Sequence, residues 1–274
     1  MTTWQKIIKY GAILLAFFLI FQIIFLILWG FRLFGSFLGL YDKEEVVCSS
    51  NMTEIASENT FPSKLDIELN FTHLVIQRGA KFQVSSNSSA ITYEKKDNTA
   101  YIRENVNFLD SSFGNEQDCL VISLPDSVFD KVAIEAGAGT IDISGLQSYY
   151  FELDQGAGRV SLRDVYIHSK ADISGGAGEM NIESSTLTNA DLDLGIGKFT
   201  LYGELIGKSE MNAGIGSVAL HLENGLNRYT FHVNKGIGSV TIQDEDIRDD
   251  STYGQGQDYI DIDGGIGTIK ILEA

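Results

Sequence analysis

The chain has 274 residues, of which 44% are hydrophobic and 11% aromatic, with 28 Gly, 2 Pro and 2 Cys. Ample apolar content and scarce cysteine exclude a collagen-like repeat, a disulfide-dense miniprotein and a strongly charged disordered chain. The formal net charge of −17 argues against a nucleic-acid-binding protein, because phosphate contacts need a clustered basic surface.

Residues 1–10 are a short tail that precedes an uncharged, apolar run over residues 11–31. At about 1.5 Å per residue, a helix over this run crosses a hydrocarbon core of about 30 Å. We therefore predict one transmembrane helix there. The alternative is a cleaved signal peptide, but its apolar region is about 7 to 15 residues long, and a small-residue cleavage site should follow it. This sequence has no such site.

The charges that flank the apolar run predict its orientation. Lys6 and Lys9 precede the run, and a mostly acidic segment follows Arg32. Basic residues favour the cytoplasmic side, so we expect a single-pass protein of the cell membrane with a cytoplasmic N-terminus. Only three basic residues and no acidic ones lie before position 42, which leaves 17 basic and 37 acidic side chains beyond it. Anionic lipid headgroups should repel such a domain.

We assign residues 32–60 to a juxtamembrane segment and linker, and residues 61–274 to an extracytoplasmic domain. Cys48 and Cys119 both fall on the predicted exterior side. In an oxidising compartment they could form one disulfide, and the alternative is two unpaired thiols. The sequence has no C-x-x-C motif, which argues against a redox motif or a zinc ribbon.

A G-x-G core recurs seven times, at successive offsets of 19, 20, 19, 19, 22 and 29 residues. Its glycines are Gly137 and Gly139, Gly156 and Gly158, Gly176 and Gly178, Gly195 and Gly197, Gly214 and Gly216, Gly236 and Gly238, and Gly265 and Gly267. Relative to the first glycine, apolar residues usually occupy positions −5, −3, +4 and +6, and a small or branched residue occupies +1. The second copy shows the pattern with Phe151, Leu153, Ala157, Val160 and Leu162.

This alternation has period two, so the segments on either side of each core are predicted strands. Between +1 and +4 the parity switches, which a flat strand cannot do without turning its apolar face to water. The glycines therefore predict a corner, where residues lacking Cβ are favoured. One such unit cannot bury its apolar face alone, so we predict an all-β, stacked β-solenoid with coils of about 19 to 22 residues. A meandering β-sandwich with less regular strand spacing is the alternative.

The two ends of the repeat differ from its centre. Residues 61–124 contain strand-like runs without the G-x-G core and are predicted to form irregular first coils or a cap. The polar residues 243–258 are predicted to form a loop that projects from the stack. Few residues follow the seventh copy, so we expect little C-terminal cap.

Residues 124–146 (LPDSVFDKVAIEAGAGTIDISGL) and their echoes at residues 192–203 and 211–225 resemble the bacterial putative-adhesin family. The resemblance covers about residues 61–274. It implies a repetitive β-solenoid related to the toast-rack domains of cell-envelope stress regulators. It also implies a surface-exposed or membrane-anchored, non-enzymatic module, and it brings no catalytic or binding residues with it.

The sequence contains no complete motif for a phosphate-binding loop, a dinucleotide site or a β-roll calcium site. Residues 203–209 (GELIGKS) have one residue too few between their glycines for a phosphate-binding loop, and no core extends to G-x-G-x-x-G. Two runs superficially match β-roll calcium repeats, but Met180 and Ile269 occupy the aspartate position and should face the core. The histidines lack metal-site spacing and are expected to be scattered on the surface: His73, His168, His221 and His232. We assign no catalytic residue, metal ligand or cofactor.

Carboxylates recur on the outward face before the corner, at positions −4 and −2. They are Glu135, Glu152, Asp154, Asp172, Asp191, Asp193, Glu210, Asp261 and Asp263. If the coils stack in register, these groups repeat about every 4.8 Å. Such an acidic face could bind divalent cations or a basic partner, and the alternative is a solvated face that keeps the rod soluble.

Three functions remain open at this stage. The first is an adhesin-like binding module for an unknown protein or surface polymer, for which the exposed aromatics Tyr149 and Tyr150 are candidates, with Phe151 predicted to point inward. The second is an envelope-stress regulatory accessory whose membrane helix pairs with a sensor kinase or transporter. The third, an enzyme acting on polysaccharide, lacks the matched acid, base or metal groups that catalysis needs. The oligomeric state does not follow from the sequence.

Overall fold

The computed structural model describes residues 48, 51–58, 60–105 and 118–274. The predicted transmembrane helix over residues 11–31 lies outside them. Within this described part, no helix is long and apolar enough to cross a membrane. The described residues form strands and one short 3-10 helix, so the all-β prediction is confirmed.

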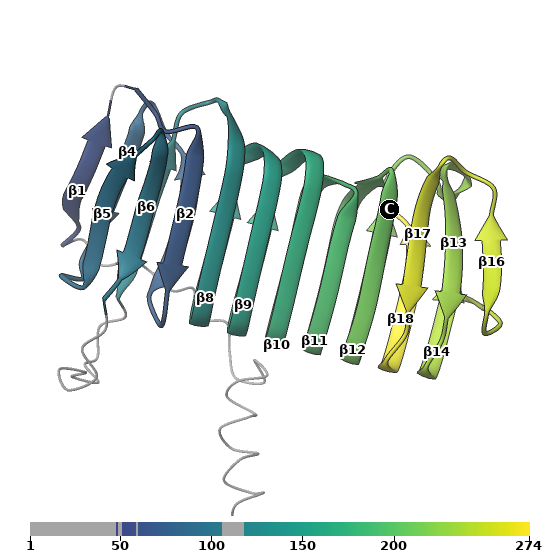
Figure 1. The fold of residues 1–274 in the computed structure, drawn as a ribbon. Coiled ribbons are helices and arrows are strands. Elements are labelled where there is room, and N and C mark those ends of the chain that lie inside the picture. The colour runs from purple at the N-terminus through teal and green to yellow at the C-terminus, as the bar shows by residue number, and fades with distance from the viewer. Residues whose placement is uncertain (1–47, 49–50, 59, 106–117) are drawn as a thin grey trace, which may run out of the picture. The chain divides into compact units, whose positions relative to one another are not determined.

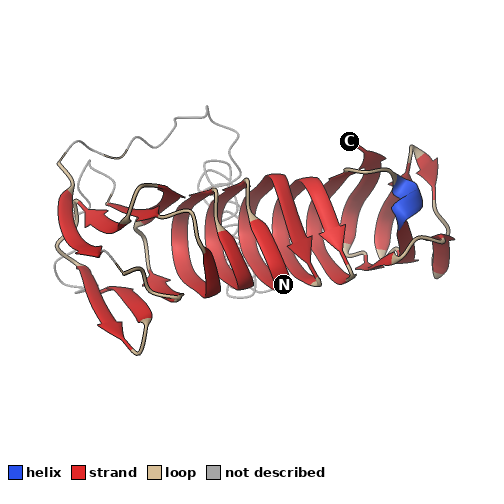
Figure 2. Cartoon of the chain, turned by 90° about the horizontal axis from the view of Figure 1, so that it is seen from above, coloured by secondary structure: helices blue, strands red, loops and turns tan. Residues whose placement is uncertain are grey.

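Five long, bent strands form the centre of the β domain (Figure 1). They are β8 (Val128–Ser144), β9 (Gln147–Arg163), β10 (Tyr166–Thr188), β11 (Ala190–Ile206) and β12 (Lys208–Leu222). Each one is a coil, and neighbouring coils pair in parallel with the second corner glycines aligned, as in Gly139 opposite Gly158. Seen from above, the bent ribbons lie side by side along the stack (Figure 2). The predicted stack of coils with glycine corners is therefore confirmed.

The core lies between the two arms of each coil. In β9 the side chains of Phe151, Leu153, Val160 and Leu162 are at most 2% exposed. Burying such a side chain stabilises the fold by about 1.5–3 kcal/mol, and stacking repeats this contribution in every coil. The positions before and after the corner that the sequence pattern predicted to be buried are therefore buried.

The C-terminal coils do not follow chain order. The sixth copy forms β13 (Tyr229–Asn234) and β14 (Ile237–Ile242), after the 3-10 helix η1 (Leu226–Arg228). The seventh forms β17 (Asp258–Asp263) and β18 (Ile266–Glu273), and this coil pairs with β12 on one side and with β13 and β14 on the other. After β12 the sixth copy therefore does not pair with the fifth coil. The seventh copy occupies the place in the stack between them.

This arrangement overturns two expectations about the C-terminal end. The stack does not end at the seventh copy, and residues 243–258 are not simply a projecting loop. They contain β15 (Glu245–Asp246) and β16 (Ser251–Gly254), which pair antiparallel with β14 and β13. These short strands cover the edges of the outermost coil, which would otherwise present unpaired backbone groups.

The N-terminal strands form the cap that the sequence predicted. They are β1 (Thr53–Glu58), β2 (Lys64–Leu69), β3 (His73–Arg78), β4 (Phe82–Ser86), β5 (Ile91–Lys96), β6 (Thr99–Glu104) and β7 (Cys119–Leu124). β2 and β3 make an irregular coil against β8, and β6 and β7 lie outside it. β5 then pairs antiparallel with β6, β4 pairs antiparallel with β7, and β1 pairs antiparallel with β4. Strand structure therefore begins within the segment 32–60 that the sequence assigned to a linker.

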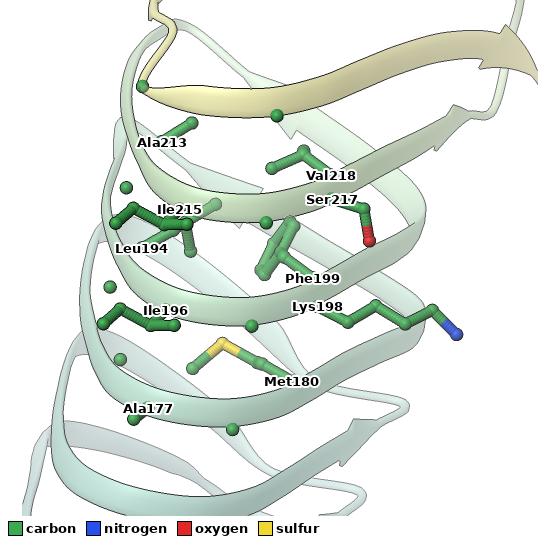
Figure 3. A pocket seen from close by; sticks show the side chains of 18 of the residues that line it. Ala177, Met180, Leu194, Ile196, Lys198, Phe199, Ala213, Ile215, Ser217 and Val218 are labelled. Carbon is green, nitrogen blue, oxygen red and sulfur yellow. The ribbon is translucent and has the colours of Figure 1, made fainter. Parts of the chain in front are cut away.

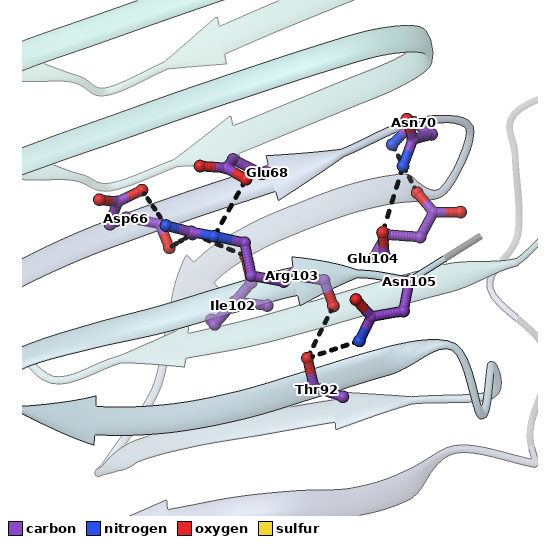
Figure 4. A network of polar contacts seen from close by, with 8 residues as sticks. All are labelled: Asp66, Glu68, Asn70, Thr92, Ile102, Arg103, Glu104 and Asn105. Atoms are coloured by element: carbon purple, nitrogen blue, oxygen red, sulfur yellow. Dashed lines mark hydrogen bonds and ion pairs between the residues drawn. The ribbon is translucent and has the colours of Figure 1, made fainter. Parts of the chain in front are cut away.

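The first coil turns without a G-x-G core. At its corner, the Glu104 carboxylate accepts a hydrogen bond from the backbone N–H of Asn70 at 2.6 Å (Figure 4). It also accepts hydrogen bonds from the backbone N–H groups of Phe71 and Thr72, at 3.1 and 3.3 Å. The adjacent Arg103 pairs with two acidic side chains of β2. A charged acceptor thus satisfies the backbone donors that this turn leaves without strand partners.

Candidate functional site

The glycine corners form one continuous edge of the stack, because the backbones of neighbouring coils are in direct contact there. A Cβ on Gly195 would lie 1.9 Å from the carbonyl oxygen of Gly176 in the preceding coil. Gly197 has φ 144°, and its Cβ would lie 1.8 Å from the carbonyl oxygen of Gly178. Only the residue between the two glycines can carry a side chain at this edge, so the +1 position decides what the edge presents.

The +1 residues change from alanine to isoleucine along the stack. The four isoleucines are 43% exposed at Ile196, 49% at Ile215, 50% at Ile266 and 72% at Ile237. Strand register places them in that spatial order on four adjacent coils. We call this set the isoleucine ladder. The sequence pattern grouped +1 with the apolar core positions, and for these four residues that grouping is wrong, because the chain is turning where they lie.

An apolar groove runs beside the ladder. Its lining includes core side chains that reach the corner, namely Met180, Phe199, Val218 and Ile269, and the partly buried Leu194 and Ala213. Figure 3 shows Ile196 and Ile215 one above the other along the corner, with Met180 and Phe199 farther from it. Its cavity volume is only about 60 Å³, so the groove is shallow. Ligand pockets usually measure about 300–1,000 Å³, so this groove offers an apolar contact surface and not an enclosed ligand pocket.

The predicted acidic face is assembled in register. One column contains Glu152, Asp172, Asp191, Glu210 and Asp261 on successive coils. The other contains Glu135, Asp154, Asp193 and Asp263, but Ser174 separates Asp154 from Asp193 and Asn212 separates Asp193 from Asp263. Lysines on the same face pair with three of these groups: Lys131 with Glu152 at 2.7 Å, Lys170 with Asp172 at 3.4 Å and Lys208 with Glu210 at 2.9 Å. In the described part of the chain, no three of these carboxylates bring their oxygens close enough to hold one metal ion.

Asp191 has the least favourable position on this face. It lies between Asp172 and Glu210 of the neighbouring coils. Burial, and then the charge of Asp172, raises the pKa of the Asp191 carboxyl above its ordinary value of 3.8. Because the fold disfavours the ionised form, Asp191 makes the protein less stable as pH rises from 3.8 through the raised pKa.

Asp191→Asn is therefore expected to stabilise the protein at pH 7 by about 0.5–1 kcal/mol, the size of a like-charge contact near water. The gain should shrink as pH falls and vanish below pH 3.8, where the wild-type carboxyl is protonated in both states. Urea unfolding of both proteins at pH 7 and pH 3 checks this, with Asp244→Asn in an exposed turn as control. An equal gain at both pH values would contradict the electrostatic cause.

The aromatic candidates are divided between surface and core. Tyr149 and Tyr150 are 48% and 53% exposed, whereas Phe151 is 1% exposed and points inward as predicted. A second aromatic pair, Tyr202 stacked on His221 with ring centroids 4.0 Å apart, lies on adjacent coils. Their separation of 19 residues equals the offset between the fourth and fifth G-x-G cores, so the repeat itself already indicated that they would be neighbours.

Cys48 and Cys119 are joined by a disulfide, with their Cα atoms 5.7 Å apart. It ties the segment before β1 to the first residue of β7. His73 lies in the same region and is 1% exposed, so the expectation that all four histidines lie on the surface is wrong. His73 opens β3 opposite Cys119 of β7, and Nε2 of its ring lies 3.0 Å from Asp142 Oδ2.

Comparison with known proteins gives a match to a family model and likenesses to solved structures, including the following two. The family model described as Toastrack DUF4097 matches residues 68–270. A putative cell adhesion protein from Clostridium sporogenes ATCC 15579 is 16% identical, with 82% of this chain and 100% of that chain covered and a TM-score of 0.37. A putative adhesin from Bacteroides fragilis NCTC 9343 is 13% identical, with 81% and 98% covered and a TM-score of 0.39. None of the curated proteins matches the sequence.

Proposed function

Because the chain belongs to the Toastrack DUF4097 family, we propose that it is an adhesin-like, non-enzymatic interaction module. In this proposal, residues 11–31 anchor it in the cell membrane and the β domain lies outside the cytoplasm. The uncharged run and its flanking charges support the anchor and its orientation.

The isoleucine ladder is the observation that carries the proposal. The first three glycine corners of the stack hold alanine at the same position, so the corner itself does not need a large side chain. The four isoleucines are not needed to complete the core either, because the −5, −3, +4 and +6 side chains already fill it. Contiguous exposed apolar surface is uncommon on monomeric proteins and marks interaction sites.

The shape and charge of the surface limit the partner. Four ladder positions at a coil spacing of about 4.8 Å make a strip about 14 Å long, which suits a short extended segment. The strip is apolar, and the adjoining domain is strongly acidic. We therefore expect a neutral or cationic partner that presents apolar groups, from a surface protein or a surface polymer.

The triple variant Ile196→Ser, Ile215→Ser, Ile266→Ser is expected to lose partner capture by at least tenfold while its unfolding midpoint stays close to that of the wild type. Exposed side chains contribute little to stability, whereas central apolar residues of an interface dominate binding. The measurement is in-cell photo-crosslinking from a probe at Ile237, followed by mass spectrometry.

The double variant Tyr149→Ser, Tyr150→Ser is the matched control, because it removes a comparable exposed apolar surface elsewhere. Capture that survives in the triple variant and fails in the tyrosine variant would move the binding surface to β9. A probe placed within residues 11–31 tests the regulatory alternative. Capture of a sensor kinase or transporter there, with none at the ladder, would replace the adhesin-like function.

A further inference from the structure

Three side chains of metal-ligand type meet at the N-terminal end of the β domain. The sulfur atoms of Cys48 and Cys119 and a ring nitrogen of His73 all lie within 4.8 Å of one another. His73 and Cys119 are buried, and Cys48 is half-buried. In the described part of the chain, no other group of three such side chains brings its ligand atoms this close.

The His73 ring has the arrangement of a metal ligand. Its Nε2 lies 3.0 Å from the Asp142 carboxylate, and its buried Nδ1 has no hydrogen-bond partner among the described residues. A neutral ring that donates its proton to Asp142 carries its lone pair at Nδ1. A buried acceptor without a partner is unfavourable and calls for an explanation. Histidines that bind metals commonly donate from the other ring nitrogen to a carboxylate, as this one does.

Strand pairing holds these groups in place. His73 and Cys119 face each other across the parallel pair of β3 and β7. Asp142 belongs to β8, on the other side of β3. The histidine is therefore fixed between the carboxylate that orients it and a sulfur. Cys48 approaches from the segment before β1 and supplies the second sulfur.

We propose that Cys48, Cys119 and His73 form a Cys2His site for Zn²⁺, or a similar thiolate-binding ion, when the disulfide is reduced. A dithiol reductant first gives up two electrons and two protons to the disulfide, which yields two thiols and an oxidised dithiol. Zn²⁺ then binds both sulfurs and Nδ1 and releases two thiol protons. Each ligand atom needs to lie about 2.0–2.3 Å from the ion, and the fourth tetrahedral position is left to water.

The oxidised and metal-bound states exclude each other, because the same two sulfurs form the disulfide or bind the ion. Both states hold Cys48 against β7. The metal-bound state also gives His73 Nδ1 a partner, which the disulfide state does not. Asp142 acts as a positioning residue that fixes the orientation and the tautomer of the ring.

The test uses the full, untagged chain in detergent, reduced with a phosphine, freed of reductant without air and titrated with Co²⁺. One equivalent should bind and produce thiolate-to-cobalt charge-transfer absorption, and Zn²⁺ should displace it. The oxidised protein and the Cys48→Ser, Cys119→Ser variant should show no such absorption. Asp142→Asn should weaken Zn²⁺ binding by about 10 to 100-fold. His73→Asn should weaken it at least tenfold, and His232→Asn serves as the unaffected control.

A reduced wild-type protein that binds no Co²⁺ would overturn the proposal, and so would a His73→Asn variant that binds as tightly as wild type. If that variant does not fold, the wild type itself decides. In ¹⁵N-histidine spectra, Zn²⁺ should shift the Nδ1 resonance of one of the four histidines in the reduced protein. Binding without any shifted histidine would overturn the assigned ligand set.

Discussion

Gly176→Ala is expected to destabilise the β domain by more than about 4 kcal/mol, a large part of the about 5–15 kcal/mol that stabilises a typical domain. A Cβ at this position would lie 2.0 Å from the carbonyl oxygen of Gly156 in the preceding coil. The carbonyl oxygen belongs to the backbone and the Cβ is bonded directly to it, so no side-chain rotation can relieve the clash. The coils would have to separate along the stack, which would break the hydrogen bonds between β9 and β10 and open the core between them. Expression level and urea unfolding of the variant measure this.

The neighbouring residue provides a matched control for the glycine effect. A Cβ on Gly175 would meet only the terminal methyl of Met180, at 3.4 Å, and that side chain is flexible. Gly175→Ala should therefore change the free energy of unfolding by less than about 1 kcal/mol. If Gly175→Ala and Gly176→Ala had similar effects, the requirement for glycine at the corner would come from general loss of backbone flexibility and not from the close approach of the coils.

Arg228→Ala is expected to destabilise the C-terminal end by about 3 kcal/mol, because it leaves a buried carboxylate without its cation. Arg228 Nε lies 2.6 Å from Asp258 Oδ2, and the Asp258 side chain is only 5% exposed. The other oxygen of this carboxylate accepts the backbone N–H of Gly207 at 2.7 Å. Asp258 begins β17, so these contacts fix the returning chain between β12 and β13.

Hydrogen exchange of the variant should localise this loss. Amides of β17 and β18 should exchange faster, while those of β8 and β9 keep their wild-type protection. Lys208→Ala is the control, since Lys208 and Glu210 form a pair in which both side chains are more than half exposed. Such a pair contributes about 0–1 kcal/mol. Uniform loss of protection along the whole stack would contradict a local role for Arg228.

The sequence predicted the coils well because their signal is local. Period-two alternation reports which side of a strand is buried, and the paired glycines report where the backbone must turn. The core residues Phe151 and Leu153 could therefore be identified before any contact was known. The predicted acidic face also followed from this local alternation, whereas the lysines that partly neutralise it had to be seen in place.

The isoleucine ladder and the cluster around His73 could not be predicted from local alternation. At the corner, alternation changes phase, so an isoleucine at +1 could point to the core or to solvent, and only the built turn decides. His73 gave no signal because its neighbours in space, Cys48, Cys119 and Asp142, are far away in sequence. Spacing rules for metal sites detect ligands on one element, and these ligands come from different segments.

The sequence by itself determined the all-β coil, its glycine corners, its buried positions and the acidic character of one face. These depend on the pattern of side chains along a single strand and on the lack of room for a Cβ. The tertiary structure alone decided the order of the coils. It inserted the seventh copy between the fifth and sixth and so placed Ile266 between Ile215 and Ile237 in the isoleucine ladder. Identical coils offer each other equivalent edges, so a local pattern cannot specify which edge a copy pairs with. Distant contacts such as the one between Arg228 and Asp258 can help select the edge.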